Sequence, residues 1–75
     1  MNSPLYVVAR TRDDFERWCF RQSPSELPQR VKFVANTAVL QDLVRPDVLF
    51  LEGWQSRPDW RKVYDKVLSV GGVAR

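Results

Sequence analysis

The sequence predicts a small α/β domain made of three consecutive strand–helix units around a minimal three-stranded parallel sheet. Three largely apolar runs, at residues 5–9, 31–35 and 48–51, are typical of buried strands. A segment with helical spacing of apolar residues follows each run. Because strands alternate with helices along the chain, we expect a parallel sheet with helices on both faces.

The strands are predicted to lie in the order 2-1-3, numbered along the chain. The first and third runs are the most uniformly apolar, which favours the first run at the centre of the sheet. Lys32 in the second run indicates a sheet edge, where a charge discourages aggregation. The alternative order is 1-2-3. In either order the domain corresponds to half of a flavodoxin- or Rossmann-like fold.

Each predicted helix has recognisable start and stop signals. Thr11 with an acid three residues later starts the first helix, which ends near Gln22 before a connector at 23–30 that holds two prolines. Asn36 or Thr37 starts a short second helix, and Ser56 is the expected cap of the third. The expected inward residues of the second helix are Val39, Leu40, Leu43 and Val44. Those of the third are Trp60, Val63, Tyr64, Val67 and Leu68.

Length and composition indicate one domain over residues 1–75, with a frayed tail at 73–75. A core of this size supplies only about 3–5 kcal/mol of net stability. The single cysteine, Cys19, excludes an intramolecular disulfide, and the absence of histidine excludes zinc sites of the Cys/His type. We therefore predict no metal and no cofactor, and we expect a homodimer or another protein partner. No export signal or membrane-length apolar run is seen, so we predict a cytoplasmic protein.

The predicted ligand site is the rim at the carboxyl ends of the strands, where open α/β sheets bind ligands. Arg10, Arg12 and Arg57 follow the strands or begin helices there and could hold an anion such as a nucleotide or a sugar phosphate. Trp54 lies in a turn, and its ring either folds over the sheet or contacts a partner, with Gln55 beside it. Phe20 falls off the apolar face of its helix and is a candidate interface residue.

No residue pattern indicates catalysis. Glu52 is a lone carboxylate at the rim, and no histidine could serve Ser56 as a base. Cys19 lies on an apolar helix face and is predicted to be a small buried hydrophobic residue. The chain is therefore predicted not to be an enzyme.

Residues 47–59, Asp-Val-Leu-Phe-Leu-Glu-Gly-Trp-Gln-Ser-Arg-Pro-Asp, resemble the third-strand motif of nucleoside 2-deoxyribosyltransferase-like domains. That family has Pro-Gly-Trp-Glu-Ser before a helix that carries a glutamate nucleophile. Glu52 and Gln55 depart from the motif, and Lys62 takes the place of the nucleophile. The resemblance implies an α/β domain without that catalysis. In size and arginine bias, the chain is also similar to small accessory proteins of actinobacterial phages, which implies a role in the host cytoplasm.

Three functions follow from these observations. The first is a non-enzymatic interaction protein, phage-encoded, that binds itself or a host or phage protein through an aromatic and arginine surface around Trp54, Arg57 and Phe20. The second is binding of a nucleotide or sugar phosphate at the rim. The third is weak nucleic-acid binding. The net charge of +3 argues against the third, because acids alternate with the basic residues.

Overall fold

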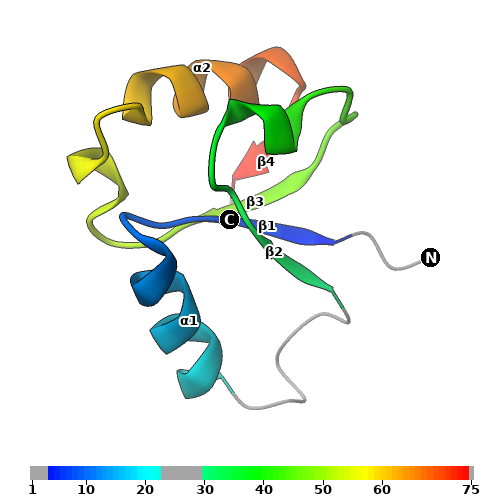
Figure 1. Ribbon diagram of the computed structural model, residues 1–75. Coiled ribbons are helices and arrows are strands. Elements are labelled where there is room, and N and C mark those ends of the chain that lie inside the picture. Colours follow the sequence, from blue (N-terminus) through cyan, green and yellow to red (C-terminus); the bar gives the residue numbers. More distant parts are fainter. Residues whose placement is uncertain (1–3, 23–29, 75) are drawn as a thin grey trace.

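The computed structural model describes residues 4–22 and 30–74 of the chain. Within them, four parallel strands form one sheet in the order β2-β1-β3-β4. The strands are β1 (Leu5–Val8), β2 (Val31–Phe33), β3 (Asp47–Phe50) and β4 (Val73–Ala74). The predicted order 2-1-3 is therefore confirmed, and Lys32 lies on an edge strand (Figure 1).

The first apolar run forms β1, which lies between β2 and β3. Every side chain of β1 is buried, as expected for an inner strand. Leu5 pairs with Val31 on one side and with Asp47 on the other, and this register continues along the strand. Alternate residues point to opposite faces of a sheet. Both faces of β1 are buried, so a helical segment must cover each of them.

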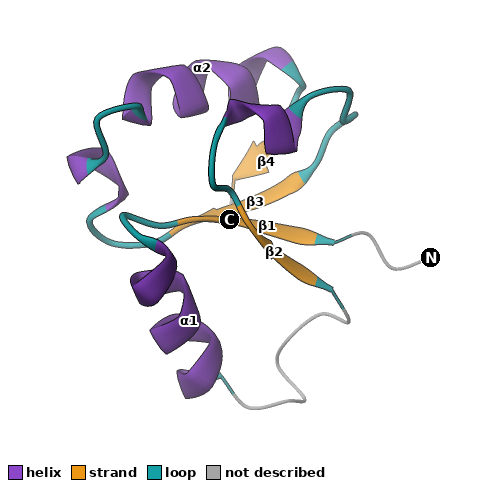
Figure 2. Cartoon of the chain, in the orientation of Figure 1, coloured by secondary structure: helices purple, strands orange, loops and turns teal. Residues whose placement is uncertain are grey.

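Helical segments lie on both sides of the sheet (Figures 1 and 2). Among the described helical segments, only α1 (Arg12–Arg21) covers one of the two faces. The 3-10 helix η1 (Thr37–Leu40), the 3-10 helix η2 (Trp54–Ser56) and α2 (Trp60–Ser69) lie on the other side. The main core cluster lies beneath η1 and α2. Its buried members are Tyr6, Val8, Val34, Leu40, Val48, Val63 and Val67.

The fold differs from the prediction in the number of strands. Val73 and Ala74, expected to fray, form β4 beside β3, with Val73 opposite Asp47. Gly72 makes this return possible, because a Cβ at this position would lie 2.6 Å from the Cγ1 atom of Val67. The close approach lets the chain turn back against α2 and enter the sheet. Arg75 lies outside the described residues.

The second predicted helix is shorter than expected. It is a single 3-10 turn, capped by Asn36 as expected, whose side-chain oxygen accepts a hydrogen bond from the N–H of Ala38 at 2.9 Å. Asp42 and Arg45 have positive φ angles of 65° and 49°, which end the helical path before the predicted stripe is complete. Leu40 is buried, but Val44 is 85% exposed instead of facing the core.

The two α-helices occupy their predicted stretches, but not every cap is as predicted, and Leu68, expected to face the core, is 59% exposed. Thr11 caps α1, since its hydroxyl accepts the N–H of Asp14 at 3.2 Å. The third helix begins at Trp60, with Asp59 as its N-cap, and Ser56 ends the preceding 3-10 turn instead of capping α2. Of the predicted connector, residues 23–29 lie outside the described residues. No helix in residues 4–22 and 30–74 is long and apolar enough to cross a membrane.

Candidate functional site

Arg57 lies at the carboxyl ends of β1 and β2 and is only 6% exposed. Its Nη1 group donates to the carbonyl oxygens of Val34 at 2.7 Å and Ala9 at 3.2 Å. Its Nη2 group donates to the carbonyl of Ala35 at 2.9 Å. Nε and Nη2 also donate to the two carboxylate oxygens of Asp59, at 2.9 and 3.1 Å.

These contacts use all five N–H donors of the guanidinium group. They also satisfy three carbonyl groups at the strand ends, which would otherwise be left without donors. The only buried charged side chain among the described residues is therefore a structural clamp. It joins the ends of two strands to the start of α2, and no donor is left for a ligand.

The clamp makes stability depend on pH through Asp59. The hydrogen bond from Arg57 holds the pKa of the Asp59 carboxyl below its ordinary value. Because the folded pKa is lowered, the contribution to stability is present above the unfolded pKa and is lost as pH falls through the folded pKa. We expect urea denaturation to show that wild type and Asp59→Asn differ at pH 7 and converge below about pH 4. A constant difference from pH 7 to pH 3 would contradict this role of the carboxylate.

Trp54 follows Gly53, which has a φ angle of 88° and allows the chain to turn sharply after β3. The Trp54 ring lies 4.5 Å from that of Phe50 and 6.0 Å from that of Tyr64, measured between centroids. It is half-buried and packs against the core, while Gln55 is exposed. The ring therefore folds over the sheet, which is one of the two alternatives that the sequence left open.

Of the predicted residues, the fold brings Arg12 near Arg57, since the guanidinium groups of both lie over the ring of Phe33, and it separates the others. Arg10 pairs with Asp14, with 3.1 Å between Nε and Oδ2. Arg12 lies over the ring of Phe33, 5.2 Å from its centroid, beside the β2 edge. Phe20 is 93% exposed on α1, across the sheet from the aromatic cluster of Trp54. The structure thus does not bring Trp54, Arg57 and Phe20 into one continuous surface.

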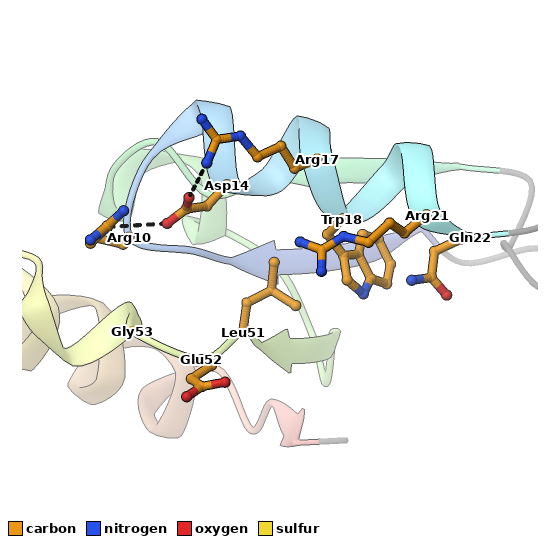
Figure 3. Close-up of a pocket in the computed structure, with 9 residues that line it drawn as sticks. All are labelled: Arg10, Asp14, Arg17, Trp18, Arg21, Gln22, Leu51, Glu52 and Gly53. Carbon is orange, nitrogen blue, oxygen red and sulfur yellow. Dashed lines mark hydrogen bonds and ion pairs between the residues drawn. The ribbon is translucent and has the colours of Figure 1, made fainter.

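A pocket of about 420 Å³ lies between α1 and the loop that follows β3 (Figure 3). Of the predicted residues it contains only Arg10. Its other lining residues are Asp14, Arg17, Trp18, Arg21, Gln22, Leu51, Glu52 and Gly53. The helical spacing of positions 14, 17, 18, 21 and 22 could have identified this side of α1, since the loop after β3 was already placed at the same rim.

The described residues hold no cluster of acid, cysteine or histidine side chains that could bind a metal ion. Burial raises the pKa of the Cys19 thiol, and the charge of Glu16 raises it further. The thiol is therefore protonated at neutral pH, which makes it a poor nucleophile.

Comparison of the chain with protein-family models, with curated proteins and with solved structures gives no match.

Proposed function

We propose that the chain is a non-enzymatic interaction protein and that the outer face of α1 is its contact surface. The observation that carries this proposal is Phe20, a large aromatic side chain that is 93% exposed. Aromatic residues are frequent energetic anchors of protein interfaces. The helix that presents it has no fully buried residue, in contrast to α2, which buries Val63 and Val67.

The partner that this face fits is a second copy of the chain. Its residues, Asp13, Glu16, Arg17, Phe20 and Arg21, surround a depression of about 610 Å³. Of these residues, the acids Asp13 and Glu16 lie in the first half of α1, and Arg17 and Arg21 lie in the second half. In an antiparallel, two-fold arrangement, the acidic half of one helix faces the basic half of the other. The charge pattern is thus complementary to itself, and Phe20 of each copy lies about 5 Å along the helix from the two-fold axis, against the acidic half of the other copy.

A dimer also suits the size of the domain, because a core of this length supplies little net stability. The resemblance to phage accessory proteins supports a second kind of partner, a host or phage protein that docks on the same face. The two partners are distinguished by the mass of the purified protein in solution.

Replacing Phe20 with serine is expected to convert a dimer into a monomer. Burying one phenylalanine contributes about 1.5–3 kcal/mol, and a two-fold interface holds two of them. The dissociation constant should therefore rise at least about tenfold. Sedimentation equilibrium over a concentration series measures it, and circular dichroism checks that the fold is kept. Leu68→Ser is the matched control, because Leu68 is 59% exposed on α2 and should leave the dimer intact.

Charge reversal tests the antiparallel arrangement. Glu16→Lys alone and Arg17→Glu alone should each weaken self-association, whereas an equimolar mixture of the two variants should form a heterodimer. If wild-type protein stays a monomer at millimolar concentration, self-association is refuted. A host or phage protein captured by wild type but not by Phe20→Ser would then support the other partner.

A further inference from the structure

The pocket beside α1 lies where the direction of the chain connections changes. After β1 the chain enters α1 on one face of the sheet, and after β3 it enters η2 and α2 on the other (Figure 1). Because these two strands are neighbours, their loops diverge and open a crevice at the carboxyl ends. Arg10 forms one wall of this crevice, and Leu51, Glu52 and Gly53 form the other.

We propose that this crevice binds a small organic phosphate that carries a flat ring, of the mononucleotide class. The pocket shares Arg17 and Arg21 with the outer face of α1, so binding is tested in the Phe20→Ser variant as well as in wild type. A volume of about 420 Å³ falls within the range of about 300–1,000 Å³ that is common for small-molecule sites.

The charges of the pocket favour an anion. Arg10 and Arg17 share a single carboxylate, that of Asp14, at 3.1 and 3.9 Å. Arg21 has no ion pair with any described residue. The carboxylate of Glu52 points away from α1 in Figure 3. Arg10, Arg17 and Arg21 therefore outnumber the carboxylates of Asp14 and Glu52 along the pocket lining, and arginine binds phosphate oxygens through paired N–H donors.

Trp18 supplies a surface for the ring. Its side chain projects from α1 toward Leu51, into the pocket (Figure 3). The rings of Phe50, Trp54 and Trp60 contact one another or Tyr64, but that of Trp18 contacts no aromatic or guanidinium group of a described residue. An indole without such a partner, beside unpaired arginine, is suited to stack against a base.

The loop after β3 leaves room for the ligand. Gly53 has no side chain, so a ligand can approach the backbone closely at this point. The N–H groups of Glu52 and Gly53 donate no hydrogen bond to any described residue.

The test is a titration of the full chain with adenosine 5′-monophosphate and cytidine 5′-monophosphate, followed by two-dimensional NMR of the backbone and indole N–H groups. We expect millimolar or tighter binding, with shifts at Trp18, Arg21 and Gly53. Adenosine and inorganic phosphate, each offered alone, should bind at least about fivefold more weakly, since each makes only part of the contacts.

Two variants and one control complete the test. Trp18→Leu and Arg21→Gln should each raise the dissociation constant at least about fivefold. Arg12→Gln makes the same change in net charge outside the pocket, and it should alter the dissociation constant of the nucleotide less than about twofold. The titrations are repeated in the Phe20→Ser background, so that self-association cannot affect them. Failure of both nucleotides to shift these signals at 10 mM, or an equal loss in Arg12→Gln and Arg21→Gln, would overturn the proposal.

Discussion

Replacing Arg57 with alanine is expected to remove most of the stability of this domain. The substitution leaves the carbonyl groups of Ala9, Val34 and Ala35 without their donors and the Asp59 carboxylate without its partner. The Asp59 side chain is 34% exposed and can be hydrated, but three carbonyl groups that each lose a donor, at about 1–3 kcal/mol each, together cost roughly 3 kcal/mol or more. That is comparable with the whole net stability of a domain of this size.

Urea denaturation followed by circular dichroism measures the effect of Arg57→Ala. Arg57→Lys should recover only part of the loss, because an ammonium group has three donors and not the planar fork of five. Arg61→Ala is the control, since Arg61 is exposed and its guanidinium lies 5.1 Å from the ring centroid of Trp60. This substitution should cost less than about 1 kcal/mol. A loss below about 1 kcal/mol for Arg57→Ala would show that the clamp is not structural.

Leu40→Ala is the second substitution expected to have a large effect. Leu40 is fully buried in the core cluster, although it belongs to a 3-10 helix of only four residues. Shortening it removes buried apolar surface and leaves a cavity, which costs about 2–5 kcal/mol for a leucine. We expect a clear fall in the midpoint of thermal unfolding, with Leu40→Val intermediate.

Val44→Ala is the matched control from the same predicted helical stripe. Val44 is 85% exposed, so its truncation should change stability by less than about 0.5 kcal/mol. If both substitutions cost the same, the assignment of Leu40 to the core and of Val44 to the surface would be wrong.

The sequence predicted the strand order because hydrophobicity alone distinguishes a central strand from an edge strand. Every side chain of β1 is buried, whereas Lys32 places β2 at the edge. Start signals were informative where a short-range hydrogen bond decides the conformation, as for Thr11 and Asn36. The helical spacing of α2 was equally clear, because Val63 and Val67 lie one turn apart on its buried face.

Other features required the folded chain. The strand β4 depends on the close approach of Gly72 to Val67, which no local pattern encodes. The exposure of Val44 follows from the positive φ angles of Asp42 and Arg45, which end the helical path. The sequence thus missed β4, and it predicted a helix at residues 37–40 without its correct extent.

The candidate site was likewise predicted only in part from the sequence. By itself the sequence determined the parallel sheet, its order and the position of the rim at the carboxyl ends of the strands, because these follow from local hydrophobicity and a general rule of topology. Only the tertiary structure decided which side chains occupy that rim. It placed Arg57 beneath the rim as a clamp and brought Trp18 and Arg21 to the crevice. The physical reason is that a side chain's role depends on the groups that surround it, and those groups come from segments distant in the sequence.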